Sequence, residues 1–210
     1  MITTLATRLR TIASLRLSIV AVCAVVAIVL AHEVHEGQPI AADAAIMHAV
    51  HGAATPFLDA LARALTWIGN PVPTTAITVV AAGTLAAFGR RREAIALALG
   101  VLAATLLDLA LKEVFERVRP NLWPHAPVPG DSFPSGHAVT STILFGALAA
   151  FAGRIAPRRA RTFAFAAALL VAGIAASRVY LGVHWPSDVV AGVAIGYLCL
   201  ALLLRLTPPD

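Results

Sequence analysis

The stretch FPSGHAVTSTILFGALAAFAG, residues 133–153, joins a polar entrance to an apolar run. No charged side chain occurs between Ala138 and Gly153, and such a run is typical of a helix that crosses a bilayer. His137 lies where the polar entrance ends. A titratable imidazole at the start of a hydrophobic helix needs a reason, so the residues that could meet it elsewhere in the chain matter.

Five further apolar runs flank this stretch. They cover residues 17–31, 72–88, 94–111, 163–176 and 189–204. Each run is close to or below the roughly 17–25 residues that a helix needs to cross about 30 Å of hydrocarbon, so the helices must continue into their flanks. No alternating pattern indicates a barrel, and helices satisfy their own backbone hydrogen bonds. The sequence therefore predicts an all-α polytopic membrane protein, a bundle of six transmembrane helices in a single domain, residues 1–210.

The composition favours a membrane protein over a nucleic-acid-binding protein. Hydrophobic residues make up 59% of the 210 residues, charged residues make up 13%, and the mean hydropathy is +0.83. About a quarter of the residues of a soluble globular protein are charged. The formal net charge is +5, but the arginines form short clusters between apolar runs instead of one basic face. Cys23 and Cys199 both lie inside apolar runs and predict neither a disulfide nor a metal cluster.

The positions of the basic residues predict the orientation of the bundle. Eleven of the sixteen lie before the first run, between the second and third, between the fourth and fifth, or after the sixth. These places share one side of the membrane, and the positive-inside rule assigns that side and both termini to the cytoplasm. The other five are Arg63, Lys112, Arg117, Arg119 and Arg178. They fall on the extracytoplasmic side, and topology does not explain them.

The part of the chain before the second run has two features with alternatives. Its basic start, short apolar core and small Ala31 also fit a secretory signal peptide, but the five later runs favour a retained helix. Residues 41–68 carry apolar side chains at helical spacing with charged ones between them. This pattern predicts one or two amphipathic helices on the outer interface, the second starting at Pro56. We expect His48 and His51 there to be interfacial rather than catalytic.

Three segments on the extracytoplasmic side carry the informative polar residues, and the first is residues 107–120. It contains Asp108, Lys112, Glu116 and Arg119 at spacings of four, four and three. A helix that continues to Pro120 would place them along one stripe, with two long cations able to reach one target. The alternative is an ordinary row of ion pairs. We expect Asp108 and Glu116 to face away from a bound anion or to adjust the charge of Lys112.

The second segment is the polar entrance itself. Ser135 is placed to cap the helix that begins near Gly136, and the first free N–H groups of that helix form a site for an anion. Gly136 lets a ligand approach the backbone closely, and His137 lies beside it in the first turn. The alternative is a plain capped helix with an interfacial histidine.

The third segment, residues 177–190, reads SRVYLGVHWPSDVV. Arg178 offers a planar fork of donors that suits phosphate oxygens. Asp188 follows His184 by four residues at a helix that starts with proline, so its carboxylate can accept from one ring nitrogen. The other nitrogen then keeps a lone pair and can act as a nucleophile or a base. The alternative is a structural histidine beside a helix-capping aspartate.

The loops that contain these segments open on the same side of the predicted bundle. Two histidines, an aspartate, a lysine, two arginines and a helix N-terminus can therefore converge. Three cations beside lipid are costly unless a multiply charged anion lies between them. The sequence therefore predicts a phosphate site at the extracytoplasmic surface.

The same residues resemble a known family signature. Its three parts are Lys112 followed after six residues by Arg119-Pro120, then Pro134-Ser135-Gly136-His137, then Ser177-Arg178 with His184 and Asp188 at the family spacing. The combination is similar to the type 2 phosphatidic acid phosphatase family, whose superfamily includes the vanadium haloperoxidases. The resemblance covers roughly residues 14–206 and agrees with the six-helix plan.

The resemblance implies a metal-independent phosphatase that needs no cofactor. His184 would attack phosphorus to form a phosphohistidine, Asp188 would orient it, and His137 would protonate the leaving oxygen and then activate water. The phosphate would be held by Lys112, Arg119, Ser135, Gly136 and Arg178. These roles are chiefly positioning and charge stabilisation, which phosphoryl transfer requires.

A site at the outer interface suits a substrate whose tail stays in lipid. We expect a lipid phosphate, with undecaprenyl diphosphate before phosphatidylglycerophosphate or phosphatidic acid, in the inner or plasma membrane. Membrane lipids are the expected partners, with no nucleic acid and no obligate protein partner. One alternative is a lipid phosphotransferase with the same site. Another is an anion channel or transporter, which gives no reason for the spacing of two histidines and an aspartate. A haloperoxidase is less expected because those relatives are larger soluble chains.

Overall fold

The computed structural model describes residues 2–37, 40–124 and 127–208, and these residues form helices and connections without a strand. The helices are α1 (Ile2–His35), α2 (Ala41–Gly52), α3 (Pro56–Ile68), α4 (Pro71–Ala87), α5 (Arg91–Phe115), α6 (Gly136–Ile155), α7 (Ala160–Tyr180) and α8 (Pro186–Leu206). A short 3-10 turn, η1 (Pro157–Arg159), joins α6 to α7. The all-α prediction is confirmed.

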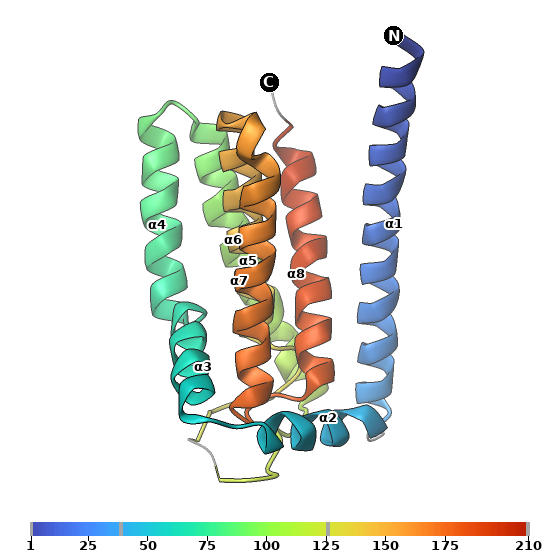
Figure 1. Ribbon diagram of the computed structural model, residues 1–210, viewed down its shortest axis with the longest axis vertical. Helices are drawn as coiled ribbons and strands as arrows, with labels where there is room; N and C mark the ends of the chain where they lie inside the picture. The colour runs from blue at the N-terminus through green and yellow to red at the C-terminus, as the bar shows by residue number, and fades with distance from the viewer. Residues whose placement is uncertain (1, 38–39, 125–126, 209–210) are drawn as a thin grey trace.

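Six helices form the bundle: α1, α4, α5, α6, α7 and α8 (Figure 1). Five segments of the described chain are long and apolar enough to cross a membrane: residues 17–35, 91–115, 136–155, 157–180 and 186–206. Helix α4 has 17 residues, so at about 1.5 Å per residue it extends roughly 26 Å, slightly less than the hydrocarbon thickness. The six predicted runs therefore correspond to six helices, one of them short for a span.

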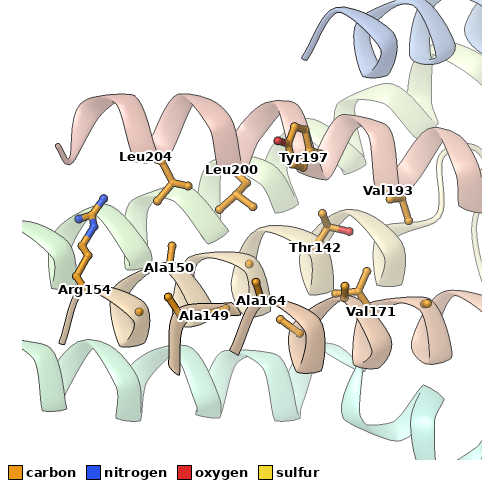
Figure 2. A pocket seen from close by; sticks show the side chains of 16 residues that line it. Thr142, Ala149, Ala150, Arg154, Ala164, Val171, Val193, Tyr197, Leu200 and Leu204 are labelled. Atoms are coloured by element: carbon orange, nitrogen blue, oxygen red, sulfur yellow. The ribbon is translucent and has the colours of Figure 1, made fainter. Parts of the chain in front are cut away.

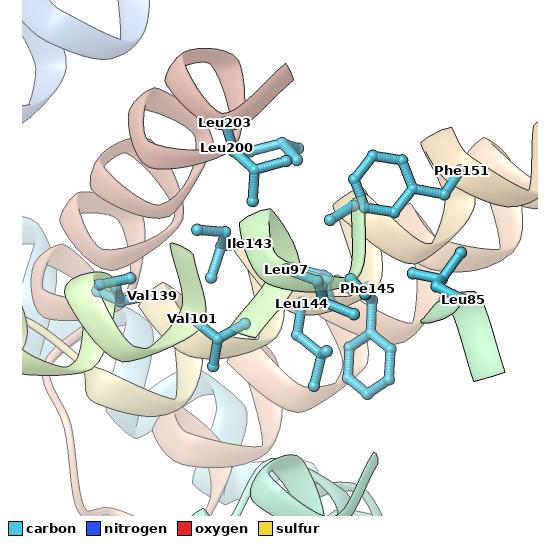
Figure 3. Close-up of a cluster of buried hydrophobic side chains, with 14 of the residues drawn as sticks. Leu85, Leu97, Val101, Val139, Ile143, Leu144, Phe145, Phe151, Leu200 and Leu203 are labelled. Carbon is cyan, nitrogen blue, oxygen red and sulfur yellow. The ribbon is translucent and has the colours of Figure 1, made fainter. Parts of the chain in front are cut away.

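Helix α6, the helix of the opening stretch, is central and packs on α4, α5, α7 and α8. Its Val139 and Ile143 are buried in a core cluster with Leu97 of α5 and Leu200 of α8 (Figure 3). Helix α8 approaches closely because Gly196 has no side chain: a Cβ there would lie 2.6 Å from the carbonyl oxygen of Val139. This packing fixes the start of α6 relative to α5 and α8.

The outward faces of the helices are apolar. Exposed examples on five of the helices are Val25, Val80, Leu99, Phe165 and Leu202. Monomeric soluble proteins rarely expose apolar surface on this scale, whereas lipid covers it without cost. The exposed side chains therefore agree with a protein that spans a membrane.

The two ends of the bundle carry different segments. Both termini, the α4–α5 turn and the α6–α7 turn lie at one end, called here the terminus end (Figure 1). The α5–α6 connection, the α7–α8 loop and α2 lie at the other end, called here the site end. The arginine clusters that the sequence assigns to one side belong to segments of the terminus end, so they share one end of the bundle as predicted.

The sequence predicts one or two helices in residues 41–68, and the structure contains two, α2 and α3. Helix α2 lies across the site end (Figure 1). Helix α3 begins at Pro56, as predicted, and the Oγ1 of Thr55 caps it by accepting from the N–H of Leu58 at 3.2 Å. Helix α3 is steeply inclined in this view and packs along α7. The ring of His51 stacks on Trp123, with centroids 4.1 Å apart.

Helix α1 joins the bundle near the site end. Leu30, Ala31 and Val34 pack in one cluster with Phe133 of the polar entrance and Ala191 of α8. These contacts place the last turns of α1 against the segment that precedes α6. They give α1 a structural role in the bundle, while its retention in the mature protein stays a prediction.

A cavity of about 760 Å³ lies between α6, α7 and α8 (Figure 2). Its lining is mostly small and apolar, as at Gly146, Ala149, Ala164 and Ala168, and Arg154 lies at one end. None of the predicted site residues lines it. The cavity follows from small side chains on the facing helices, and it is separate from the polar segments.

Candidate active site

The three polar segments meet at the site end of the bundle. Helix ends supply most of the residues: Lys112 the last turn of α5, His137 the first turn of α6, Arg178 the last turn of α7 and Asp188 the first turn of α8. His184 lies in the short loop between α7 and α8. His137 is close enough to feel the charges of His184 and of the three signature cations. The residues that the sequence singled out therefore share one site.

His184 is buried, with 2% of its surface exposed. Its Nε2 lies 3.0 Å from Nη1 of Arg119. A guanidinium can only donate, so Nε2 holds a lone pair and the ring hydrogen is on Nδ1. Burial lowers the pKa of His184 from 6.5 to about 4, although the carboxylate of Asp188 acts in the opposite direction. His184 is therefore neutral at physiological pH, with a nucleophilic nitrogen facing Arg119.

The carboxylate of Asp188 lies on the other side of this imidazole. Its Oδ2 is 3.4 Å from Nδ1 of His184, somewhat longer than an ordinary hydrogen bond. The same Oδ2 accepts from the backbone N–H of Trp185 at 2.9 Å, and Oδ1 accepts from Nη1 of Arg117 at 2.5 Å. Within the described residues Nδ1 of His184 has no closer partner. Asp188 is thus placed to take the Nδ1 hydrogen after a small movement.

Arg119 reaches the site from the α5–α6 connection and not from a helix. Helix α5 ends at Phe115, and Glu116 adopts the left-handed conformation with φ 45°. A residue in that region ends a helix because the backbone leaves the helical path there. The predicted stripe through Glu116 and Arg119 is therefore wrong, and only Asp108 and Lys112 share the helix. Glu116 is exposed.

Main-chain carbonyl groups hold the guanidinium of Arg119. Nε donates to Gly130 at 2.9 Å, Nη2 to Asp131 at 3.0 Å and Nη1 to Val183 at 2.8 Å. Carbonyl acceptors fix the fork without neutralising its charge. Arg119 is therefore held beside His184 as a full cation.

Lys112 is paired within its own helix. Its Nζ donates to both carboxylate oxygens of Asp108 at 2.6 Å and to the carbonyl of Pro134 at 2.9 Å. A Cβ at Gly136 would lie 2.6 Å from Oδ2 of Asp108, so this carboxylate occupies the space beside the glycine. Asp108 therefore covers the Cβ side of Gly136, and the expectation that a ligand approaches the backbone there stays a prediction. Asp108 contacts Lys112, as expected if its carboxylate adjusts the charge of that lysine.

Ser135 takes the N-cap position of α6, but its side chain makes no capping hydrogen bond. The predicted side-chain cap is therefore wrong. The residue is anchored instead by its backbone N–H, which donates to the carbonyl of Asp188 at 3.0 Å. Within the described residues its buried Oγ has no partner. The hydroxyl of Ser135 and the first turn of α6 are thus left for another ligand.

His137 and Arg178 each contact a residue from outside the three segments. Nε2 of His137 lies 2.8 Å from Oδ1 of Asn70, the N-cap residue of α4. Nη1 of Arg178 donates to Oγ1 of Thr66 at 2.5 Å. The Nε of Arg178 is buried and has no partner among the described residues. Arg178 therefore keeps one buried donor unused.

The PAP2 superfamily matches residues 93–209, more than half of the chain and all three polar segments. The chain belongs to the PAP2 superfamily. The family resemblance read from the signature residues is therefore confirmed.

Relatives of this PAP2 protein agree with the assignment. Phosphatidylglycerophosphatase B of Bacillus subtilis (strain 168) is 27% identical over 179 residues, 84% of this chain and 88% of its own. Decaprenylphosphoryl-5-phosphoribose phosphatase of Mycobacterium tuberculosis (strain CDC 1551 / Oshkosh) is 34% identical over 160 residues, 73% of this chain and 84% of its own. A crystal structure of a transmembrane PAP2-type phosphatidylglycerolphosphate phosphatase from Bacillus subtilis matches with a TM-score of 0.82 and 26% identity, over 89% and 94% of the two chains.

The PAP2 assignment makes the protein a membrane-bound lipid phosphatase, a hydrolase of a class that works without a metal ion. The anion channel alternative is therefore overturned. The class alone does not assign a role to each residue or choose a substrate.

Sequence reasoning missed four residues that hold the PAP2 site. Asp43, Thr66 and Asn70 lie before the matched region. Residues 41–68 were predicted to form only amphipathic helices on the outer interface. Arg117 was one of the five basic residues that topology left unexplained, and this was the available signal. It lies between the carboxylates of Asp43 and Asp188.

Proposed function

We propose that this protein hydrolyses a phosphate ester or diphosphate on a membrane lipid, at the extracytoplasmic face, through a phosphohistidine on His184. One observation carries the proposal. Within the described chain, Ser135 Oγ and Arg178 Nε are buried without hydrogen-bond partners. They belong to the same site as the imidazole of His184, whose Nε2 carries no hydrogen. Buried donors without partners are costly, and the oxygens of a phosphate would satisfy them.

The groups that would hold the phosphate come from all three segments. Arg119 and Arg178 offer guanidinium donors, and the free N–H groups at the start of α6 face the same site as the hydroxyl of Ser135. Lys112 would exchange one of its contacts to Asp108 for a phosphate oxygen. These donors would stabilise the charge on the equatorial oxygens as the bond to the leaving group breaks.

The first chemical step forms the phosphohistidine. Nε2 of His184 attacks phosphorus in line with the lipid oxygen, and the bond from phosphorus to that oxygen breaks. His137, which the negative charge of a bound phosphate would favour as imidazolium, gives its proton to the leaving oxygen. Asp188 accepts a hydrogen bond from Nδ1–H, which keeps its proton, and stabilises the positive charge that develops on His184.

The second step releases phosphate. Neutral His137 takes a proton from water as the water oxygen attacks phosphorus, and the bond from phosphorus to Nε2 of His184 breaks. Inorganic phosphate leaves, and His137 is again an imidazolium. Acid-base help of this kind contributes roughly 10² to 10⁴ in rate.

The sidedness of the reaction follows from the arginine clusters. They belong to the terminus end, which the positive-inside rule assigns to the cytoplasm. The site end then faces the extracytoplasmic side. Accessibility of a cysteine introduced at exposed Asn121 to an impermeant reagent, in intact cells, tests this orientation.

The substrate class is a lipid phosphate because the site lies at one end of an apolar bundle. A lipid can keep its tail in the bilayer while its phosphate reaches the polar groups. Phosphatidylglycerophosphate and undecaprenyl diphosphate are the first two candidates. The Bacillus relative that matches most of both chains supports the first. Undecaprenyl diphosphate is supported because its phosphate is recycled on the outer face of the membrane.

The proposal is tested by phosphate release from purified protein in detergent with a chelator present. The panel compares prenyl diphosphates, glycerophospholipid phosphates and soluble phosphate esters. We expect release from the lipids, no loss with chelator, and no release from a His184→Ala variant. Release that needs added magnesium, or that survives in the variant, would contradict the mechanism.

The phosphotransferase alternative uses the same phosphohistidine but hands the group to a second lipid. Release of inorganic phosphate without an acceptor lipid identifies the hydrolase. Phosphate release that appears only after an acceptor is added would favour the transferase.

A further inference from the structure

Three polar side chains from the segment before the family match each contact a member of the site. They are Asp43 of α2, Thr66 of α3 and Asn70 at the start of α4. Their partners are Arg117, Arg178 and His137. The segment predicted to lie on the outer interface therefore also reaches the site residues.

The contacts of Asp43 are the most extensive. Its Oδ1 accepts from the backbone N–H of Ser187 at 2.9 Å, and its Oδ2 accepts from the Ser187 hydroxyl at 2.5 Å. Oδ2 also accepts from Nη2 of Arg117 at 2.9 Å. Asp43 is 3% exposed. A carboxylate of α2 thus holds the first turn of α8, where the helix dipole favours an anion.

Arg117 connects this carboxylate to the site. Its Nη1 donates to Oδ1 of Asp188 at 2.5 Å and to the hydroxyl of Ser187 at 2.7 Å. One guanidinium therefore lies between two buried carboxylates that would otherwise repel each other. Because Oδ1 of Asp188 is taken by Arg117, Oδ2 is the oxygen that faces Nδ1 of His184.

We propose that Asp43 and Arg117 form a positioning pair that orients the carboxylate of Asp188 toward His184. The inference rests on the proposed function, since it assigns His184 as the nucleophile. Neither member of the pair touches the phosphate. Their effect is on the rate at which a bound phosphate is attacked, because a rotated Asp188 no longer holds the His184 ring and its Nδ1 hydrogen.

The test compares two buried arginines that each pair with a carboxylate. The side chain of Arg117 is 14% exposed and that of Arg154, at the terminus end, is 17% exposed. We expect Arg117→Gln to lower kcat about 10- to 100-fold, the usual effect of losing a residue that orients a site group, with KM within about threefold. Arg154→Gln removes a similar ion pair and should leave kcat within about twofold, whatever it does to thermal stability.

The conservative variants separate positioning from folding. Arg117→Lys keeps the charge but cannot bridge both carboxylates with one fork, so its kcat should lie between those of the native protein and Arg117→Gln. Asp43→Asn should lower kcat in the same direction, whereas Glu93→Gln at the terminus end should not.

Two results would overturn the inference. One is a kcat of Arg117→Gln within about twofold of the native value in folded protein, and the other is an equal loss in Arg154→Gln. If Arg117→Gln fails to fold, an Arg117→Lys kcat equal to the native value overturns the inference, and a partial loss supports it. The proposed function fails separately, by phosphate release from His184→Ala.

Asn70 supports a second, independent inference at the other histidine. When Oδ1 of Asn70 accepts, Nε2 of His137 carries the hydrogen, so Nδ1 is the nitrogen left to exchange a proton with the substrate. The backbone also confines the ring, since a Cβ at Gly69 would lie 2.9 Å from Cδ2 of His137. We infer that Asn70 is a positioning residue for the proton donor His137.

The test of Asn70 uses two substrates that differ in their leaving group. An alkyl phosphate and an alkylphenyl phosphate with tails of similar length need proton donation to different degrees, because the phenolate leaves more easily. Asn70→Ala should lower kcat/KM for the alkyl phosphate about tenfold more than for the alkylphenyl phosphate, as should His137→Ala. Equal losses on the two substrates would contradict the inference and indicate a structural role only.

Discussion

The terminus end and the site end both bury ion pairs, but their polar atoms are used differently. At the terminus end Arg154 donates to Glu93 at 2.7 Å and to the carbonyl of Thr207 at 2.6 Å, and Arg90 pairs with the same carboxylate. These contacts join three parts of the bundle and satisfy their donors. Among the described residues, the buried side-chain atom without a hydrogen bond at this end is an acceptor, Oε2 of Glu93, and it forms an ion pair with Nε of Arg90. The terminus end is thus a structural network without unused buried donors.

The site end has a similar network around Arg117, but it also contains polar atoms without partners. Within the described residues these include the hydroxyl of Ser135 and the Nε of Arg178. Buried polar groups are normally satisfied, so donors left over at one end indicate a place for a ligand. Charged side chains occur at both ends and therefore do not identify the site. Buried donors without partners beside a neutral imidazole identify it.

Replacing the nucleophile His184 should give the largest difference in turnover between a variant at the site end and a variant at the terminus end. His184→Ala should lower kcat by roughly 10⁴-fold or more, because it removes the nitrogen that would form the covalent intermediate. Arg154→Gln should leave kcat nearly unchanged. The measurement is phosphate release from a lipid phosphate in detergent. A His184→Ala variant within about tenfold of the native rate would break the comparison.

The proton donor ranks second. His137→Ala should lower kcat by roughly 10² to 10⁴, the usual contribution of a general acid or base. Turnover at several pH values, with circular dichroism as a control for folding, measures the effect. An undiminished rate would remove His137 from the reaction.

The acid limit of the reaction should follow His184. Its pKa is lowered to about 4 by burial, while Asp188 opposes this and Arg178 and Arg119 add to it. The nucleophile is neutral above this value, so kcat/KM should fall as the pH drops through about 4. An acid limb centred near the ordinary histidine value would show that the buried neutral form does not govern catalysis.

The same lowered pKa makes the folded state sensitive to acid. The unfolded chain protonates this histidine near 6.5 and the folded chain only near 4, so stability is lost as the pH falls between these values. The loss approaches roughly 3 kcal/mol at the low end. Thermal unfolding in detergent should show less of this slope in His184→Gln. An unchanged slope in the variant would assign the acid sensitivity to other groups.

The smallest effects come from glycines that set helix spacing. A Cβ at Gly192 of α8 would lie 2.7 Å from the carbonyl of Ser135, whereas a Cβ at Gly83 of α4 meets nothing within 4 Å. Gly192→Ala should therefore lower stability by about 1–3 kcal/mol and also lower turnover, since it displaces Ser135. Gly83→Ala should be neutral or slightly stabilising. Equal melting temperatures for the two variants would contradict the packing account.

The fold was largely predictable because lipid imposes a simple pattern. Apolar runs predicted the long helices, and the arginine clusters predicted which connections share one end of the bundle. Pro56 predicted the start of α3. The exact end of α5 was not predictable. Glu116 ends the helix in the left-handed conformation, and a glutamate carries no local signal for it.

The site was predictable where the chemistry is carried by residue types at fixed spacing. His184, Asp188 and the signature cations converge as expected. The position of Asp108 beside Gly136 was not predictable, because only the packing of α5 on α6 brings that carboxylate there. Asp43 was missed because its contacts with Arg117 are long-range and no helical spacing encodes them.

The central claim is that His184 becomes phosphorylated, and trapping the phosphoenzyme tests it most directly. A lipid substrate labelled in its terminal phosphate is mixed with the protein and quenched in alkali, in which phosphohistidine survives. We predict label on the native protein and none on His184→Ala. With an alkylphenyl phosphate, whose leaving group needs little protonation, His137→Ala should carry more label because water attack is slowed. Label that remains on His184→Ala, or peptide mapping that places it on another residue, would contradict the account.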